Sequence, residues 1–421
     1  MEVKRGYKRT EVGVVPDDWE VRQMAELTDK CRPISYGIVQ TGPNIIDGIP
    51  CLRVLDINEG QINKSGLITT TKQISESYKR TILEAGDLVM PLRGKVGDVG
   101  TIDDELKGAN LTRGVALIAL RPSWNGPFCR QLISSSGTRR RLEQTMHGSA
   151  LQEIPIATLR SFKIALPPSL AEQHAIAKAL GDVDALLGAL ERLIAKKRDL
   201  KQAAMQQLLT GKTRLPGFSG EWEVRRLGAL ARIQRGASPR PIDSPIWFSE
   251  SSSIGWVRIS DVTKSGMYLE ETKQRLSPIG VQHSRPVSRG SLIMSICATV
   301  GRPIVTGIDV CIHDGFVVFD DLQADQLFMY YSLKWIEPSW SKHGQTGSQM
   351  NLNTGLIKQT DVSMPPTPEE QQAIAAALTD MDAELVALEQ RLAKTRDLKQ
   401  AMMQELLTGK TRLLSPQEAH A

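Results

Sequence analysis

Two stretches of the chain carry apolar residues at alternating intervals of four and three positions. The first stretch contains Ile176, Leu180, Val183, Leu187, Leu190 and Ile194. The second contains Ile374, Leu378, Met381, Leu385, Leu388 and Leu392. This spacing gathers apolar side chains on one stripe of an α-helix, and its repetition over several turns is typical of a coiled-coil seam. The pattern therefore predicts two long helices with matching apolar stripes.

The start of each predicted helix is marked by capping residues. Ser169 is followed three positions later by Glu172, and Thr367 by Glu370. This is the spacing of a capping box, in which both side chains accept hydrogen bonds from backbone N–H groups of the first turn. Each helix then spans about 40 residues, or ~60 Å. Because one small domain cannot bury such a helix, we expect the two to pair as an antiparallel coiled coil. The alternative is that each helix packs only against the globular segment beside it.

Both helical stretches end in the same eight residues, LLTGKTRL, at 208–215 and 406–413. The letters Gly-Lys-Thr suggest the end of a phosphate-binding loop. Such a loop follows a strand and needs a glycine five positions earlier, where this chain has Gln206 and Gln404 after a helix. The glycine of each copy instead predicts a left-handed cap at the end of its helix. We therefore expect no nucleotide site here.

The helical stretches belong to an internal duplication. Residues 166–215 align without a gap with residues 364–413, and 34 of these 50 positions are identical. Weaker matches continue outside this block, such as WEVR at 19–22 and again at 222–225. A duplication that stays nearly identical in one part and diverges in the other indicates two different roles. The predicted organisation is a first module at 1–165, a first long helix at 166–212, a second module at 213–363, and a second long helix with a C-terminal tail at 364–421.

The two modules have a different pattern of apolar and polar residues from the helices. Short apolar runs, such as GVALIAL at 114–120 and FVVFD at 316–320, are separated by Gly, Pro, Asn and Asp. This pattern is typical of strands and turns in a mixed α/β domain. One helix is predicted in each module, at 127–146 and 322–341. The expected fold class is α+β, with two mixed α/β domains, two long helices in an antiparallel coiled coil, and an internal pseudo-twofold repeat.

Composition narrows the class of protein only slightly. The net charge of +5 and the pI near 8.9 are compatible with nucleic-acid binding without requiring it. The five cysteines are scattered, and none are spaced as Cys-x-x-Cys, which argues against a disulfide framework or a zinc ribbon. The sequence has no secretory signal and no apolar run near the ~20 residues of a membrane span, so we expect a cytoplasmic protein.

The sequence also lacks recognisable catalytic motifs. The six histidines have no metal-ligand spacing, and no Gly-x-Ser-x-Gly elbow is present. The Pro-Pro pairs follow Leu or Met, so they do not form the Asn/Asp-Pro-Pro-Tyr/Phe signature of an amino-methyltransferase. We therefore predict no catalytic, cofactor-binding or metal-binding residues in this chain.

Several longer motifs carry a family resemblance. YKRTEVGVVPDDWEV at 7–21 is echoed by GKTRLPGFSGEWEV at 211–224, and SYGIVQTG stands at 35–42. LPPSLAEQHAIAKAL at 166–180 and MPPTPEEQQAIAAAL at 364–378 each lead into a helix that ends LLTGKTRL. Together these motifs cover most of the chain, and they resemble the specificity subunit of type I restriction–modification systems.

The resemblance implies a function in DNA recognition. Each module would be a target-recognition domain that reads one half of a bipartite, asymmetric site in double-stranded DNA, and the helices would fix the spacing between the halves. Two methyltransferase subunits using S-adenosylmethionine and two ATP-dependent, Mg-requiring restriction subunits would dock on this scaffold. The chain itself would be non-catalytic and bind no cofactor. The alternatives are a coiled-coil scaffold protein with ligand- or protein-binding end domains, or a complete DNA-modifying enzyme.

Residue types suited to DNA point to a set of candidate contacts. Base edges are read by Arg, Lys, Asn and Gln, whereas phosphates are held by cations, hydroxyls and backbone N–H groups. In the first module the candidates are Arg93, Lys95, Asn110, Thr112, Arg113, Arg139, Arg140 and Arg141. In the second they are Arg235, Ser238, Arg240, Arg302, Gln345, Ser348, Gln349 and Asn351. The run 139–141 would fan around a helix, which favours phosphate contact over base reading.

Two pairs of residues are retained in both modules. Arg53 and Asp56 in the first module match Arg258 and Asp261 in the second. Residues that read different half-sites should differ, so these pairs are predicted to maintain the shared fold.

Overall fold

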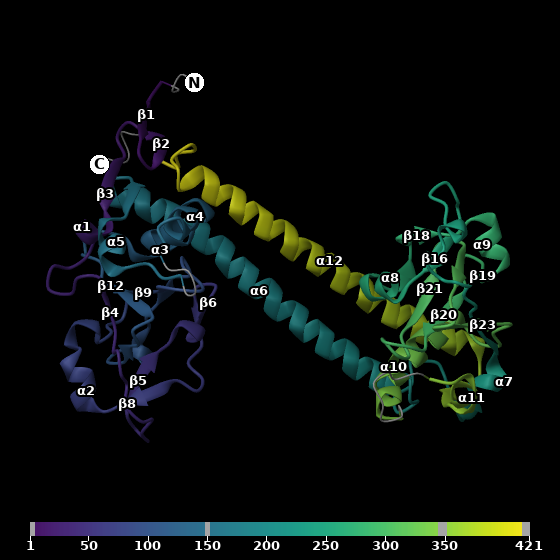
Figure 1. The fold of residues 1–421 in the computed structure, drawn as a ribbon. Coiled ribbons are helices and arrows are strands. Elements are labelled where there is room, and N and C mark those ends of the chain that lie inside the picture. Colours follow the sequence, from purple (N-terminus) through teal and green to yellow (C-terminus); the bar gives the residue numbers. More distant parts are fainter. Residues whose placement is uncertain (1–4, 148–151, 344–351, 415–421) are drawn as a thin grey trace. The chain divides into compact units, whose positions relative to one another are not determined.

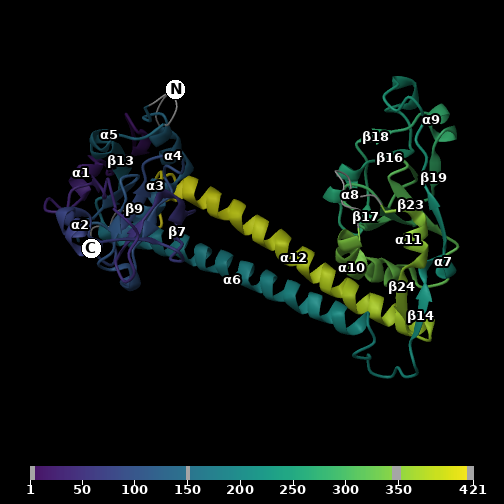
Figure 2. The same ribbon diagram turned by 60° about the horizontal axis from the view of Figure 1, so that its bottom comes forward.

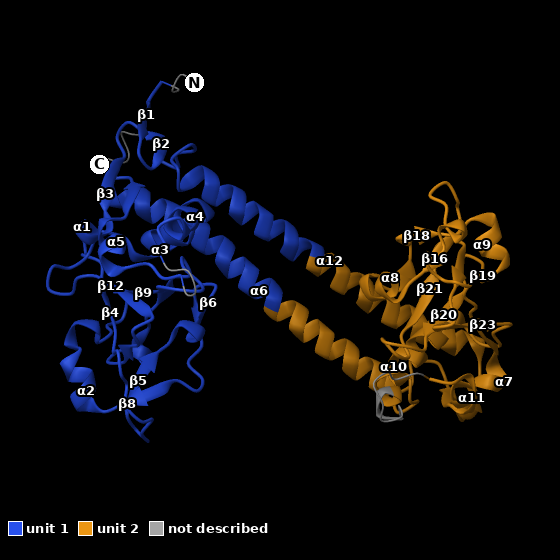
Figure 3. Ribbon diagram, viewed as in Figure 1, with its two compact units in different colours: residues 1–191, 390–421 blue, residues 192–389 orange. Residues whose placement is uncertain are grey.

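The computed structural model describes residues 5–147, 152–343 and 352–414. The chain divides into two compact units (Figure 3). Unit 1 combines Met1–Glu191 with Gln390–Ala421, and unit 2 is the continuous segment Arg192–Glu389. Each unit therefore contains one module together with a part of both long helices, because the unit boundaries fall within the helices.

The two long helices are α6 (Leu170–Leu208) and α12 (Pro368–Leu406), each of 39 residues. Within each unit the two helices lie side by side (Figures 1 and 2). In unit 1, Asp184 pairs with Lys399 at 2.7 Å and Glu191 with Arg396 at 2.6 Å. The order of partners along α12 is the reverse of that along α6, so the helices are antiparallel. Unit 2 has the corresponding pairs Lys197–Glu384, Arg198–Glu389 and Lys201–Asp382.

The apolar stripes face inward along this helix pair. All twelve of the predicted seam residues are buried or half-buried. Leu186, Leu193 and Leu200, which recur at intervals of seven on α6, are instead 39–47% exposed. The helices thus keep a second, partly apolar face that their mutual packing does not cover.

The first module is built on two small sheets. The larger has the order β10-β9-β12-β4, and the smaller has the order β11-β5-β8, in which β11 and β5 are parallel. Their bounds are β4 (Ser35–Tyr36), β5 (Ile49–Leu52), β8 (Ile68–Thr70), β9 (Leu88–Pro91), β10 (Gly100–Thr101), β11 (Asn110–Leu111) and β12 (Val115–Ile118). The remaining strands are β1 (Tyr7–Thr10), β2 (Gly13–Pro16), β3 (Glu20–Gln23), β6 (Ile57–Asn58), β7 (Gln61–Ile62) and β13 (Lys163–Leu166). The helices are α1 (Met24–Leu27), α2 (Lys72–Ser77), α3 (Gly126–Ser134), α4 (Ser136–Glu143) and α5 (Ile156–Ser161).

The second module repeats this plan. Its sheets have the orders β15-β23-β20-β21-β17 and β18-β16-β22-β19, with β16 and β22 parallel. Their bounds are β15 (Arg232–Arg235), β16 (Gly255–Val257), β17 (Tyr268–Leu269), β18 (Gln274–Arg275), β19 (Arg285–Val287), β20 (Leu292–Ser295), β21 (Pro303–Thr306), β22 (Val310–Ile312) and β23 (Phe316–Asp320). A separate pair joins β14 (Glu223–Arg226) to β24 (Asp361–Met364). The helices are α7 (Leu227–Leu230), α8 (Ile259–Lys264), α9 (Pro278–Gln282), α10 (Gln326–His343) and α11 (Thr354–Gln359).

The single helix predicted at 127–146 is wrong, because two helices, α3 and α4, occupy this region. Ser135 separates them in an extended conformation, with φ −62° and ψ 146°. Its side chain accepts a hydrogen bond from the backbone N–H of Thr138 and so caps α4. Serine competes with the helix for such local hydrogen bonds, which explains the break.

We expect Ser135→Ala to lower the free energy of unfolding of unit 1 by about 1 kcal/mol, because the cap of α4 loses its side-chain acceptor. Urea unfolding followed by far-UV circular dichroism measures the change. Ser136→Ala, at the exposed first position of α4, is the matched control and should change the stability by less than about 0.5 kcal/mol. Equal effects of the two substitutions would show that the cap contributes nothing.

The predicted ends of the long helices are confirmed at their C-termini. Gly211 and Gly409 have φ values of +69° and +68°, the left-handed conformation of a helix cap. A Cβ atom at Gly409 would lie 2.5 Å from Pro16, and one at Gly211 would lie 3.0 Å from the Trp222 ring. The repeated LLTGKTRL segments are therefore packed against the modules as well as ending the helices.

The capping boxes predicted at the helix starts are only half formed. Ser169 and Thr367 accept hydrogen bonds from the N–H groups three residues later, as expected. The Glu172 carboxylate, however, accepts a hydrogen bond from Arg412 at 2.8 Å, and Glu370 binds Arg214 at 2.6 Å. Each arginine comes from an LLTGKTRL segment, so the C-terminal end of one long helix is bound to the N-terminal end of the other in each unit.

Candidate nucleic-acid interface

One edge of unit 2 concentrates charged and polar side chains around Asp314. Strand β15 ends at Arg235, whose Nε donates a hydrogen bond to the backbone carbonyl of Asp314 at 2.6 Å. The Asp314 carboxylate accepts a hydrogen bond from Ser238 Oγ at 2.6 Å, and Arg240 Nη2 approaches it at 3.4 Å. Three of the residues predicted to contact DNA are thus brought together by one aspartate.

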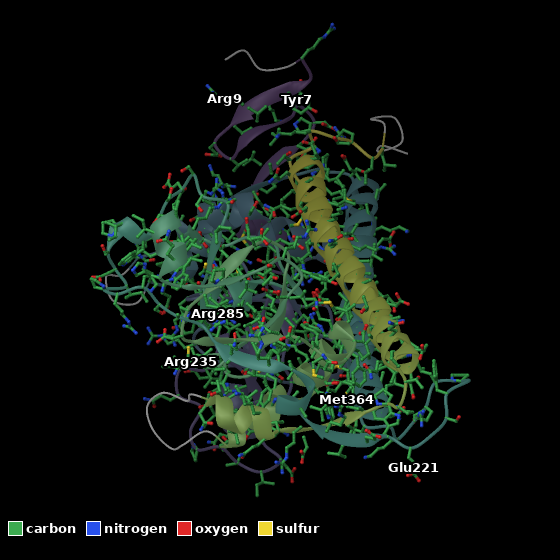
Figure 4. The ribbon with its side chains drawn as sticks, turned by 90° about the vertical axis from the view of Figure 1, so that its right-hand side faces the viewer. Tyr7, Arg9, Glu221, Arg235, Arg285 and Met364 are labelled. Atoms are coloured by element: carbon green, nitrogen blue, oxygen red, sulfur yellow. The ribbon has the colours of Figure 1, made fainter. Side chains whose placement is uncertain are left out.

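Arg285 extends this edge, although no pattern in the sequence marks it as a candidate. Its Nε donates to the carbonyl of Arg235 at 2.8 Å, and its Nη1 donates to Gln234 Oε1 at 2.6 Å. Figure 4 shows Arg235 and Arg285 on neighbouring parts of the second module. The side chain is half-buried and held in place, which favours a defined orientation over a freely solvated one.

The charges of this edge are set by its surroundings. The hydrogen bond from Ser238 lowers the pKa of Asp314, so this carboxylate is ionised at neutral pH. Burial lowers the pKa of the neighbouring His313, so its imidazole is neutral under the same conditions. The edge therefore presents guanidinium donors beside one carboxylate acceptor, which is a set of groups able to read the donor and acceptor pattern of a base edge.

The corresponding edge of unit 1 is formed by Tyr36, Thr112 and Arg113. Tyr36 ends strand β4 and is 46% exposed. Thr112 is half-buried and donates its hydroxyl to the carbonyl of Leu52 at 3.0 Å, whereas the Arg113 side chain is exposed. The backbone N–H of Arg113 donates to the Ile38 carbonyl at 2.9 Å, which fixes the turn that carries Arg113.

A hollow of about 450 Å³ lies beside Tyr36. Its lining includes Tyr78, Lys79 and Arg80, and both cations are exposed. Sequence reasoning missed these two residues, because they lie in a short 3-10 turn (Lys79–Thr81) with no distinctive pattern. Cations beside tyrosine hydroxyls suit DNA, since phosphates bind cations and accept hydrogen bonds from hydroxyls.

The structure contradicts the selection of Asn110. Its side chain is fully buried, accepts a hydrogen bond from Thr81 Oγ1 at 2.7 Å and donates to Ser75 Oγ at 3.0 Å. An amide satisfied inside the protein is unavailable to a base. Asn110 instead joins β11 to the segment that carries Lys79 and Arg80.

The arginine run 139–141 is divided among different environments. Arg139 forms an ion pair with the buried carboxylate of Asp98. Arg141 donates to the carbonyl of Lys163 at 2.6 Å and lies over the Phe162 ring. Both side chains thus have structural partners, and Arg140 is the exposed member of the run.

Of the remaining candidates, Lys95 donates to Asn58 Oδ1 at 2.7 Å, and the half-buried Arg93 lies next to Gly114, the residue that follows Arg113 in the unit 1 edge. Arg302 is half-buried and 3.8 Å from Glu337. The other four, Gln345, Ser348, Gln349 and Asn351, lie outside the described residues.

The pairs retained in both modules have a structural role. The backbone N–H of Arg53 donates to Asp56 at 2.7 Å, and that of Arg258 donates to Asp261 at 2.9 Å. Each aspartate thereby caps a short helix that follows a parallel strand. The Arg53 guanidinium also binds Asp56, whereas that of Arg258 binds Gln274 at 2.9 Å. The prediction that these pairs maintain the shared fold is confirmed for the backbone.

All five cysteines are free thiols. Across residues 5–147, 152–343 and 352–414, no group of three or more His, Cys, Asp or Glu side chains is arranged to hold a metal ion. No helix in the described part of the chain has the length and apolar character needed to cross a membrane.

Comparison with known proteins identifies the family. The model of the type I restriction modification DNA specificity domain matches the chain twice, at residues 16–198 and 219–395. These two matches cover both modules and most of both long helices. The chain therefore belongs to the family of type I restriction–modification specificity subunits.

Individual relatives agree with this assignment. The putative type I restriction enzyme MjaX specificity subunit of Methanocaldococcus jannaschii is 26% identical over 430 residues, which cover 97% of both chains. The type I restriction enzyme EcoBI specificity subunit of Escherichia coli is 28% identical over 203 residues, or 47% of this chain and 42% of that protein.

Solved structures share the fold. The S subunit of a type I restriction-modification system from M. genitalium has a TM-score of 0.59 at 15% identity, with 96% of this chain and 98% of that chain covered. A chain from a study of complex assembly and conformational transition in the type I R-M system also has a TM-score of 0.59, at 19% identity, covering 94% and 99%. The predicted fold class, two mixed α/β domains with paired long helices, is confirmed.

Proposed function

We propose that this chain is the non-catalytic subunit that gives a type I restriction–modification complex its DNA sequence specificity. Each module reads one half of a bipartite, asymmetric site in double-stranded DNA. The observation that carries this proposal is the uneven divergence of the duplication. The two modules share a fold and differ in their exposed edges, whereas the two helical segments are nearly identical. Reading two different half-sites requires modules with different exposed edges. Binding two copies of the same partner requires two similar helical segments.

The long helices supply the scaffold in this proposal. Two methyltransferase subunits and two restriction–translocase subunits dock on it, and those subunits hold S-adenosylmethionine, ATP and Mg. Leu200 and its repeat Leu398 are both exposed, which supports docking of the same partner at equivalent positions of α6 and α12.

Exchange of one module tests the proposal. Replacing residues 216–363 by the corresponding module of another specificity subunit should change one half of the methylated motif and leave the other half and the gap unchanged. Methylome sequencing of cells that express the complete system reads both halves and the gap at once. Deleting a block from both helices is the complementary variant, and it should alter the gap or prevent assembly while preserving the half-sites. Absence of any gapped motif with the unaltered chain would refute the proposal.

A further inference from the structure

The two polar edges occupy equivalent positions in the two modules. Tyr36 pairs with Ala116 on β12, and Arg235 pairs with Val317 on β23. Each is the last residue of its strand, and each is followed by a glycine. After the glycine the chain crosses to the second sheet, where Ile38 N–H donates to Leu111 at 2.7 Å and, in the other module, an equivalent bond joins Ala237 to Ile312 at 3.0 Å.

The glycine of each turn is required by close packing. A Cβ atom at Gly37 would lie 2.0 Å from the carbonyl oxygen of Leu111, and one at Gly236 would lie 2.1 Å from that of His313. These contacts are with backbone atoms, which cannot move aside as a flexible side chain would. The glycine therefore fixes the backbone path of the turn in both modules, and this backbone is a common frame for the side chains on either side of it.

The side chains in this frame differ between the modules. Tyr36 is replaced by Arg235, and Arg113, two residues after the strand residue that accepts the turn's hydrogen bond, is replaced by Asp314. The second exchange converts a hydrogen-bond donor into an acceptor at one position of a common backbone. An arginine pairs with guanine, whereas an aspartate accepts from the amino group of cytosine. Equivalent residues of opposite chemistry on the same frame are what two modules need to read different half-sites.

Cations beside each turn are placed to hold the DNA backbone. In unit 1 the exposed Lys79 and Arg80 line the hollow next to Tyr36. In unit 2 Arg285 is bonded to the carbonyl of Arg235, and Arg240 approaches Asp314. Phosphate contacts position a protein on the duplex and base contacts specify the sequence, so each edge contains both kinds of group.

We propose that these two glycine-centred turns are the base-reading elements of their modules. The specificity-determining residues are Arg113 in unit 1, and Arg235 and Asp314 in unit 2. This inference rests on the proposed function, because it names the residues that carry out the half-site reading.

Single substitutions in the complete complex test the assignment. Arg113→Ala should relax one half of the methylated motif, and Arg235→Ala should relax the other, each with a loss of roughly tenfold to a hundredfold in discrimination at the affected base pair. The gap should stay the same. Matched controls are Arg22→Ala in unit 1 and Arg232→Ala in unit 2, since both arginines are exposed and form ion pairs with neighbouring carboxylates at 2.7 and 2.9 Å. Neither control should change the motif.

The outcomes separate this inference from the proposed function. An unchanged motif with both Arg113→Ala and Arg235→Ala, or a change in the same half with both, would overturn the assignment while leaving a gapped motif. If a variant abolishes methylation, the purified complex is compared on a duplex with the intact site and on one with the corresponding half scrambled. Loss of preference for the intact half supports the assignment, and full preference refutes it. No gapped motif with the unaltered complex would instead refute the proposed function.

Discussion

Replacing Arg412 by alanine is expected to lower the free energy of unfolding of unit 1 by about 3–5 kcal/mol at pH 8. Arg412 binds both oxygens of Asp18 at 2.9 Å and Glu172 at 2.8 Å. The Glu172 side chain is 1% exposed, so its carboxylate would be left in a buried position without a counter-charge. Urea unfolding of the full chain, followed by circular dichroism, measures the change.

The cost of this substitution should depend on pH. Burial already raises the pKa of Glu172, while Arg412 lowers it, so removing the arginine raises that pKa further. An acid whose pKa is raised on folding stabilises the fold below its ordinary pKa and loses this contribution as the pH rises through the folded value. The destabilisation by Arg412→Ala should therefore be largest at pH 8 and decrease toward pH 4.

Two further variants make this prediction specific. Adding Glu172→Gln to Arg412→Ala removes the uncompensated charge and should recover part of the lost stability and most of the pH dependence. Arg214→Ala is the matched variant in unit 2, where Arg214 binds the fully buried Glu370. A loss below about 0.5 kcal/mol in both arginine variants, as for an ordinary surface substitution, would contradict a stabilising role for these pairs.

Replacing Gly236 by alanine is expected to destabilise unit 2 by about 3 kcal/mol, which is at the upper end of the usual cost of overpacking. The new Cβ atom would lie 2.1 Å from the His313 carbonyl oxygen and 2.5 Å from that of Ile312. Relief of this clash requires the end of β15 or of β22 to move. Thermal unfolding of the full chain measures the loss, and Gly37→Ala should have the same effect in unit 1.

Open glycines supply the controls for this prediction. An added Cβ atom at Gly266 in unit 2 or at Gly137 in unit 1 would meet nothing within 4 Å, and neither glycine has a positive φ. Alanine at these positions should be neutral or slightly stabilising, because it restricts the unfolded chain. If Gly236→Ala were as stable as Gly266→Ala, the turn would not be fixed by close packing.

The features predicted correctly from the sequence are those that depend on neighbouring residues. The four-three spacing from Ile176 to Ile194 is a property of one helix, and it was sufficient to predict α6 and its partner. The caps at Gly211 and Gly409 were likewise predictable, because a glycine directly after a periodic helical stretch favours the left-handed conformation that ends a helix.

The predictions that failed involve partners distant in the chain. The carboxylate of Glu172 was assigned to its own helix start, whereas its partner Arg412 is 240 positions away. Asn110 has a side chain suited to adenine, but its burial depends on the packing of β11 against residues 75–81. Arg285 was missed for the same reason, since the carbonyl group that accepts its hydrogen bond belongs to Arg235, 50 positions earlier. Local pattern cannot reveal such pairs.

The division of the chain also sets an order for folding during synthesis. Unit 2 is one continuous segment, whereas unit 1 needs residues from both ends of the chain. Leu406 and Leu407 belong to the same core as Trp19, and Tyr7 donates to the Gly409 carbonyl at 3.1 Å. A ribosome therefore makes every residue of unit 2 before it has made the last residues of unit 1. Unit 2 is thus the first of the two units to have all the residues of its core, which reverses the usual order in which domains along a chain are completed.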